Sequence, residues 1–233
     1  MKYFPLFFAL FFVFAAATVE KNYKIKDLTL KQIELNIFND DHKYYYDDLL
    51  FEFERGDTMS MDQLMHVYFG ATLMRGYHPF QLMAFENDLI LLSDQRQFET
   101  VVKQSDSLLL MRPTSLIGCL EHAHSLRKTG DTTQAKIFSN RFRQLKKVIM
   151  FSGDGKTPET AFWVTSPKDI DPIIQHKGYF TKSYKDVIID DMTYRRYIYF
   201  DKLGKKKKLY FNIDLPMNLG LDIEKEKKKK EED

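Results

Sequence analysis

The segment FSGDGKTPETAFWV, residues 151–164, separates two parts of the chain that differ in periodicity. Before it, apolar residues recur every three or four positions, as in amphipathic helices; after it, short aromatic-rich runs alternate as strands do. The glycines and the proline of this segment interrupt regular structure. The sequence therefore predicts an α+β protein. We expect helical hairpins in residues 18–152, followed by a small antiparallel sheet with one short helix in residues 153–221.

Residues 1–17 have the pattern of a secretory signal peptide. Lys2 is followed by an apolar run of about a dozen residues, Tyr3–Phe14, and then by the small residues Ala15–Ala17. An uncleaved anchor would need about 20 apolar residues, and polar residues follow too soon. We therefore expect cleavage after Ala17, no stable membrane span afterwards, and export to the periplasm or the extracellular space.

Composition narrows the possible partners. Lys and Arg number 35 and Asp and Glu 33, which gives a net charge of +2 and no basic character typical of nucleic-acid binding. The single cysteine, Cys119, excludes an intramolecular disulfide. Residues 222–233 contain no apolar side chain after Ile223, so we predict a disordered, charged tail.

The helical part contains one segment with the pattern of a tetratricopeptide unit. In residues 116–148, Ala123 and Ala135 occupy the positions where two helices of such a hairpin touch, and Gly130-Asp131 provides the turn between them. Residues 98–113 resemble the second half of a preceding unit. Earlier in the chain, Ser60 is a suitable N-cap for a helix that ends at Gly76. We therefore predict tetratricopeptide-like hairpins.

The part after the glycines has the pattern of strands. Residues 161–166 predict a first strand and residues 167–174 a short helix. Further strands are predicted at residues 179–185, 187–191, 194–200 and 208–213. Tyr197 and Tyr199 share one face, while Ile198 and Phe200 share the other. Because both faces are partly apolar, we expect one of them to pack on the helices.

The loop formed by Gly153, Asp154, Gly155 and Lys156 invites comparison with a phosphate-binding loop. That motif requires a glycine at the position of Met150, and it leads from a strand into a helix. Here the predicted order is the reverse. We therefore favour a tight turn, in which Asp154 bonds nearby amides and the glycines adopt positive φ.

No motif predicts catalysis, a metal or a cofactor. Cys119, Glu121, His122 and His124 are close in sequence, but the two histidines are two residues apart, whereas a helical zinc site uses a spacing of four. A nucleophile elbow of the Gly-x-Ser-x-Gly type is absent from the sequence. We therefore name no catalytic residue and no metal ligand, and we expect no cofactor.

Binding is the hypothesis that the helical part supports best. Helical hairpins form concave surfaces, and Tyr68, Tyr77 and His78 lie near predicted helix ends. These three residues are the candidate binding site. The alternative is that the aromatic side chains belong to the core, which we favour for Tyr68 and weigh evenly for Tyr77.

A set of residues spread over positions 45–215 carries a resemblance to a known family. These residues are Tyr46, Leu49, Leu50, Phe53, Gly56-Asp57-Thr58, Tyr68-Phe69-Gly70, Gly76-Tyr77, Pro79, Lys128, Gly130-Asp131, Ala135, Ser152–Lys156 and Ala161-Phe162. In this order they resemble an uncharacterised, exported family of Bacteroides-type bacteria that is known only as a domain of unknown function. The resemblance implies the fold and the compartment, which supports export, but it implies no catalytic residues.

These observations predict an exported, non-enzymatic binding or scaffold protein with a protein partner in the cell envelope. An envelope hydrolase with a non-standard site is the alternative, and a secreted partner that is active only in a complex is a third hypothesis. A cleft with convergent acids and a buried histidine would favour the hydrolase. A large exposed aromatic patch would favour binding.

Overall fold

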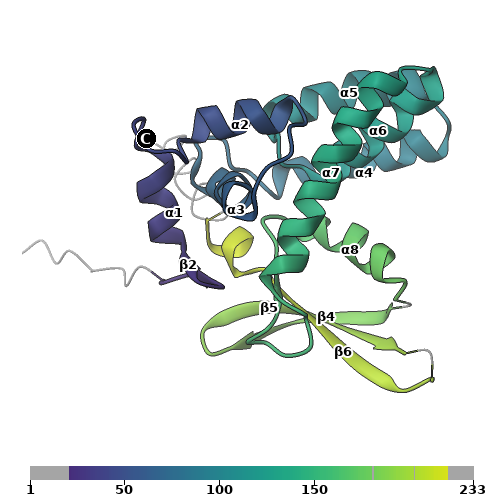
Figure 1. The fold of residues 1–233 in the computed structure, drawn as a ribbon. Coiled ribbons are helices and arrows are strands. Elements are labelled where there is room, and N and C mark those ends of the chain that lie inside the picture. Colours follow the sequence, from purple (N-terminus) through teal and green to yellow (C-terminus); the bar gives the residue numbers. More distant parts are fainter. Residues whose placement is uncertain (1–20, 180, 202, 220–233) are drawn as a thin grey trace, which may run out of the picture.

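The structure is a computed structural model that describes residues 21–179, 181–201 and 203–219 (Figure 1). Helices fill the first part of the chain and a sheet follows, which confirms the α+β class. The predicted signal peptide (1–17) and charged tail (222–233) lie outside the described residues. The elements before the glycine-rich segment are β1 (Lys24–Ile25), β2 (Leu28–Thr29), α1 (Leu30–Ile37), α2 (Tyr46–Glu54), α3 (Met61–Gly70), η1 (Ala71–Leu73), α4 (Gln81–Asp94), α5 (Phe98–Met111), α6 (Leu116–Thr129) and α7 (Thr132–Ser152). Those after it are β3 (Phe162–Trp163), η2 (Pro167–Asp169), α8 (Ile170–Lys177), β4 (Thr181–Ile189), β5 (Met192–Phe200) and β6 (Lys206–Asn212).

Helix α3 begins where its cap predicts but ends earlier. The Ser60 hydroxyl accepts a hydrogen bond from the Gln63 amide at 3.3 Å, and the Gln63 side chain accepts one from the Ser60 amide at 2.9 Å, which completes a capping box. The predicted end at Gly76 is wrong. The α-helix stops at Gly70, where the Thr72 hydroxyl donates to the Phe69 carbonyl at 2.7 Å and so competes with the helical ladder.

The α6–α7 hairpin confirms the predicted turn and helix contact. Gly130 adopts φ 101°, and Asp131 caps α7 by accepting a hydrogen bond from the Gln134 amide at 2.9 Å. Ala123 and Ala135 are both buried, so the two helices approach closely. The hairpin is therefore as expected, while its relation to tetratricopeptide repeats stays a prediction.

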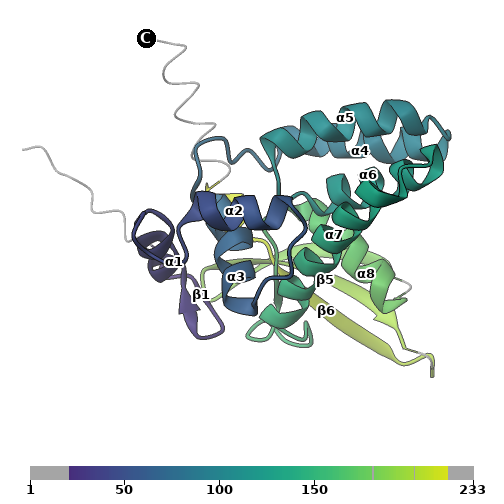
Figure 2. The ribbon, with the colours of Figure 1, turned by 45° about the horizontal axis from the view of Figure 1, so that its top comes forward.

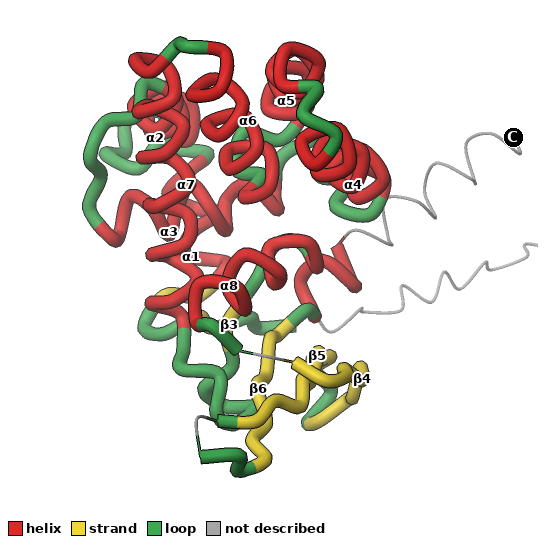
Figure 3. The backbone as a smooth tube through the Cα atoms, turned by 90° about the vertical axis from the view of Figure 1, so that its right-hand side faces the viewer, coloured by secondary structure: helices red, strands yellow, loops and turns green. Residues whose placement is uncertain are grey.

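The helices form two groups that α7 connects. Figures 1 and 2 place α1, α2 and α3 on one side and α4, α5 and α6 on the other, with α7 running between them to the sheet. Figure 3 shows the helices gathered above the sheet, with α8 lying between the two layers. The sheet therefore carries the helical layer on one face.

The four-stranded sheet has the order β3-β6-β5-β4 and is mixed rather than wholly antiparallel. Strands β4, β5 and β6 are antiparallel neighbours, as predicted. Strand β3 pairs in parallel with β6, because the chain crosses over through η2 and α8 before it enters the antiparallel strands. A single strand, β4, replaces the two strands predicted over residues 179–191, since β5 pairs along its length.

One continuous core extends through the helical and the β parts. Leu145, Val148 and Ile149 of α7 belong to the same buried cluster as Tyr197 and Phe211 of the sheet. The two ends of the described chain also meet, because the buried Asp214 carboxylate accepts a hydrogen bond from the Tyr23 hydroxyl at 2.9 Å. Contacts of this kind hold the sheet and the helices in one arrangement.

The loop from Gly153 to Lys156 is a tight turn whose polar groups bond one another. The Asp154 carboxylate accepts hydrogen bonds from the Thr160 hydroxyl at 2.7 Å and the Lys156 amide at 3.0 Å, and these bonds lower its pKa. The amides of Asp154 and Gly155 donate to the Thr160 carbonyl at 2.9 and 2.7 Å. These amides already donate hydrogen bonds within the protein, as expected of a structural turn.

The two glycines of this turn are required for different reasons. Gly155 has φ +73°, as predicted, but Gly153 is extended at φ −171°, so the expected positive φ is wrong there. A Cβ on Gly153 would lie 2.3 Å from the Thr160 backbone oxygen, and one on Gly155 would lie 2.6 Å from the Phe162 ring. Gly153 is required because the chain packs too closely for a Cβ atom. Gly155 is required for the same reason and also because its backbone has positive φ.

We predict that Gly155→Ala destabilises the protein by about 2–4 kcal/mol, because the methyl group meets Phe162 and Leu209 and the backbone has positive φ. Gly178→Ala is the matched control. Gly178 also has positive φ, but a methyl group added there would meet no atom within 4 Å, so only about 1–2 kcal/mol of backbone strain is expected. Urea denaturation measures both, and equal losses would contradict the packing argument.

Candidate functional site

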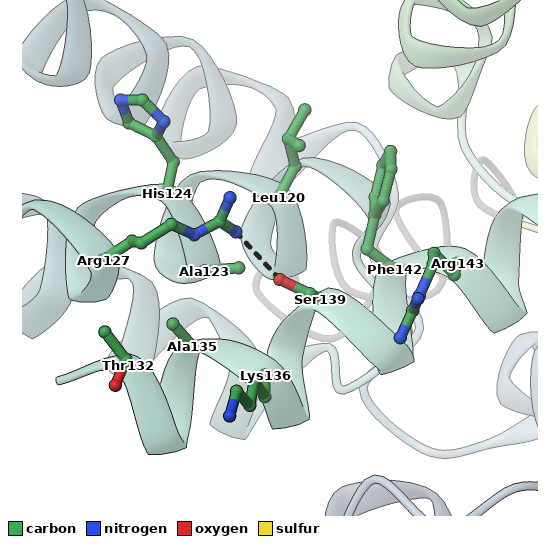
Figure 4. A pocket seen from close by; sticks show the side chains of 10 residues that line it. All are labelled: Leu120, Ala123, His124, Arg127, Thr132, Ala135, Lys136, Ser139, Phe142 and Arg143. Carbon is green, nitrogen blue, oxygen red and sulfur yellow. Dashed lines mark hydrogen bonds between the residues drawn. The ribbon is translucent and has the colours of Figure 1, made fainter.

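A groove on the α6–α7 hairpin, with a volume of about 620 Å³, is the first candidate for a binding site. Its floor is apolar and is formed by Leu120, Ala123, Ala135 and Phe142. Figure 4 shows side chains of α6 and α7 arranged along this groove. Because the two alanines are small, the hairpin leaves a hollow between its flanking side chains instead of a ridge.

The groove carries positive charge along both of its sides. Arg127 comes from α6, and Lys136 and Arg143 come from α7; none of the described residues that line the groove is an Asp or a Glu. The Arg127 guanidinium donates a hydrogen bond to the Ser139 hydroxyl at 3.0 Å across the hairpin (Figure 4). The arrangement suits a ligand that combines apolar and anionic groups.

Helical spacing explains why these side chains share a face. Leu120, His124 and Arg127 are four and three residues apart on α6, and Lys136 and Arg143 are seven apart on α7. Helix α5 packs against α6, where its Phe98 contacts the lining residue His124, and helix α3 packs against α7. Sequence reasoning missed the groove cations, although their helical spacing was a usable signal.

A second cavity, of about 320 Å³, contains two of the three predicted binding residues. Tyr77 and His78 line it together with Arg75, Arg112 and apolar side chains from α2, η1, α4 and α5. The Tyr77 hydroxyl points into the protein and donates to the Thr165 carbonyl at 2.6 Å. The ring of Tyr77 therefore forms part of the cavity wall, while its hydroxyl group is already bonded within the protein. The binding role of Tyr77 and His78 stays a prediction.

Tyr68 does not reach this cavity. Its side chain is fully buried, and its hydroxyl donates to Asp169 at 2.7 Å while accepting from the Thr165 amide at 3.1 Å. Burial raises its pKa well above the usual range, because the phenolate would lie in the core beside an acid. Tyr68 is therefore a core residue, as the interpretation favoured in the sequence analysis predicts. It is connected to the cavity through Asp169, which also accepts a hydrogen bond from the lining residue Arg112.

Behind the second cavity lies a buried charged cluster. The Arg112 guanidinium donates to Glu86 at 3.1 Å and to both carboxylate oxygens of Asp169, at 3.1 and 3.0 Å. The Ser115 hydroxyl also donates to Glu86, at 2.6 Å. Arg112 is 6% exposed and both carboxylates are 0% exposed. Three charged groups are thus removed from water, and each is stabilised by its contacts with the others.

The cluster contains two carboxylates and one guanidinium, and the pKa of the Glu86 carboxyl group is raised. Burial raises the pKa of Glu86, because a charged carboxylate is poorly solvated in the core, while Arg112 and the Ser115 hydroxyl act in the opposite direction. One Glu86 carboxylate oxygen has no hydrogen-bond partner among the described residues. Sequence reasoning missed this cluster. The available signal was Glu86 itself, a charged residue on the helical stripe that includes Leu82 and Leu89.

A third hollow, of about 260 Å³, brings together two acids from different parts of the fold. Glu121 of α6 and Asp171 of α8 both line it, with Tyr197 of the sheet. Partial burial raises the pKa of each carboxyl group, and burial raises the pKa of Tyr197 to about 12. Two acids that share a cleft are one of the two features that would favour a hydrolase. The other, a buried histidine, is not among the described residues that line this hollow.

One cluster, formed by Ser105, His122 and Asp106, has the residue types of a catalytic triad, but its serine is not accessible to a substrate. The Ser105 hydroxyl lies 2.6 Å from His122 Nδ1, and His122 Nε2 lies 3.6 Å from Asp106. Ser105 is nevertheless fully buried, and its hydroxyl also lies 2.6 Å from the Val101 carbonyl. A nucleophile must reach its substrate, so this arrangement is structural.

The residues considered for a metal are dispersed among other contacts. Cys119 is fully buried, and burial raises its pKa. His122 faces Ser105, and His124 packs edge-to-face on Phe98. Within the part of the chain that the structure describes, no three His, Cys, Asp or Glu side chains are grouped to hold a metal ion.

We predict that Arg112→Met destabilises the protein by about 3–5 kcal/mol, because Glu86 and Asp169 would remain buried without their cation. The control Arg127→Met removes an exposed arginine and should cost at most about 0.5 kcal/mol. Urea denaturation of both variants tests this. An Arg112→Met protein as stable as the unchanged protein would show that the buried acids carry no charge.

Comparison with known proteins confirms one part of the resemblance inferred from sequence, namely an uncharacterised family. Within residues 21–179, 181–201 and 203–219, no helix combines the length and the apolar character needed to cross a membrane. No curated protein and no solved structure gives a significant match to the chain. The model of one family, described as a domain of unknown function (DUF4919), matches residues 31–220. Because this match covers most of the sequence, the chain belongs to the DUF4919 family.

Proposed function

We propose that this protein is an exported, non-enzymatic binding protein that holds an acidic segment of a partner protein in the α6–α7 groove. The observation that carries the proposal is the combination of an apolar floor with Arg127, Lys136 and Arg143 and with no carboxylate among the described lining residues. Such a surface attracts an acidic partner and also gives its apolar side chains a place to pack.

The apolar floor favours a protein over other anionic partners. An amphipathic acidic helix offers apolar side chains on one stripe and carboxylates beside them, which matches Leu120 and Phe142 between the groove cations. A nucleic acid would use the cations but would leave most of this floor uncovered. We therefore infer a partner segment with the pattern of an acidic amphipathic helix.

Tetratricopeptide-like architecture is part of this proposal. In helical repeats, each hairpin buries its open face against the next one. Up to residue 219, where the described part of the chain ends, the α6–α7 hairpin is followed by the sheet and by the single helix α8, and not by another helical hairpin. We propose that the partner segment occupies the face that a further hairpin would cover.

Export to the periplasm or the extracellular space is the second component of the proposal. It is supported by Lys2, by the apolar run Tyr3–Phe14 and by the small residues Ala15–Ala17. The resemblance to exported proteins of Bacteroides-type bacteria supports the same compartment. A partner in the cell envelope is consistent with both.

The test is photo-crosslinking in the cells that produce the protein. A photoreactive residue replaces Ser139 in the groove of the full-length chain, and products are located in the envelope and secreted fractions. We expect one reproducible protein adduct whose crosslinked peptide is acidic. The double variant Lys136→Glu/Arg143→Glu should reduce the adduct at least about tenfold, because two attractive charges become repulsive.

The matched control is Lys128→Glu/Lys147→Glu, which changes the net charge by the same amount at two exposed positions, one on α6 and one on α7, that do not line the groove. This control should retain the adduct. An equal loss in both double variants would contradict a role for the groove. Adducts confined to the cytoplasm would contradict export.

An envelope hydrolase is the second candidate, and the cleft that contains Glu121 and Asp171 favours it. Their raised pKa values suit one group as a general acid. If this hypothesis holds, the purified protein hydrolyses a member of a panel of chromogenic glycosides and esters. Glu121→Gln should then lower the rate at least about a hundredfold. No turnover by the unchanged protein would contradict the hydrolase.

A further inference from the structure

The cavity lined by Tyr77 and His78 lies apart from the α6–α7 groove, and the two share no lining residue among those described. It is located where α2 and η1 meet the α4–α5 hairpin. We propose that this cavity binds a small amphipathic carboxylate, with the apolar chain inside the cavity and the carboxylate at its mouth. This site is independent of the protein-binding groove.

The size of the cavity limits the ligand. A volume of about 320 Å³ corresponds to roughly ten water molecules at about 30 Å³ each. It is at the lower end of the range of about 300–1,000 Å³ found for ligand pockets. A ligand with about ten non-hydrogen atoms therefore fits, and octanoate is a carboxylate of this size.

The walls favour an apolar body for the ligand. Leu50 of α2, Met74 after η1 and Leu82 of α4 contribute apolar side chains. Two further lining residues, Leu110 and Met111 at the end of α5, are 85% and 51% exposed. An apolar chain that covers this surface removes it from water, which is favourable in proportion to the area covered.

The charge of the lining side chains favours an anionic group. The described lining residues include Arg75, Arg112 and His78, and none of them is an Asp or a Glu. Arg112 is already paired with Glu86 and Asp169 behind the cavity, so it offers little net attraction. Arg75 is exposed and forms no salt bridge with a described residue. The carboxylate is therefore placed near Arg75.

Isothermal titration of the full chain with octanoate, octanol and octylammonium tests both halves of the proposal. We expect saturable 1:1 binding of octanoate, with octanol about tenfold weaker and octylammonium weaker still. The three probes share a chain and differ in head-group charge. Absence of saturable octanoate binding would overturn the proposal, as would equal affinity for octanoate and octylammonium.

Two variants locate the binding to this cavity. Arg75→Glu should weaken octanoate about tenfold and leave octanol unchanged, whereas Arg96→Glu, at the opposite end of the α4–α5 hairpin, should change neither. Ala71→Phe places a ring on a lining position and should abolish binding of all three probes. Circular dichroism checks that the variant is folded. If Arg75→Glu and Arg96→Glu bind octanoate equally well, the carboxylate does not lie at this mouth and the proposal fails.

Discussion

The buried pairing of Arg112 with Glu86 and Asp169 is the constraint on which the arrangement of this molecule depends. Glu86 comes from α4, Arg112 from the end of α5, and Asp169 from η2, which follows the first strand of the sheet. Charges in the core are tolerated only while each one keeps its partners. The α4–α5 hairpin must therefore remain seated on the segment that enters the sheet.

The same constraint shapes one of the two surfaces proposed for binding. Arg112 forms part of the wall of the second cavity and, because its charge is neutralised from behind, leaves Arg75 as the cation that faces solvent there. The α6–α7 groove is different, since its three cations face no acid among the described lining residues. The net charge of the whole chain is only +2, although this groove is locally basic. The local charge of a surface, and not the total charge of the protein, determines which partner it attracts.

Local signals in the sequence were sufficient for much of the secondary structure. The Ser60 cap, the Gly130 turn and the Asp154 turn each depend on hydrogen bonds or backbone angles within a few residues. The parallel pairing of β3 with β6 could not be found in this way. A two-residue strand has too short a pattern, and its partner lies about fifty residues later in the chain.

Sequence alone determined the α+β class, the position of the change from helix to strand and the close contact of α6 with α7, because periodicity, glycine and small residues act over short distances. Tyr77 and His78 were predicted as binding residues from the sequence, which did not predict the cavity that they line. Tertiary structure alone decided that Glu86 and Asp169, 26 and 57 residues from Arg112, would share one guanidinium. It likewise joined the cations of two helices around one apolar floor. These contacts depend on how distant segments pack, and pairing of that kind leaves no local pattern along the chain.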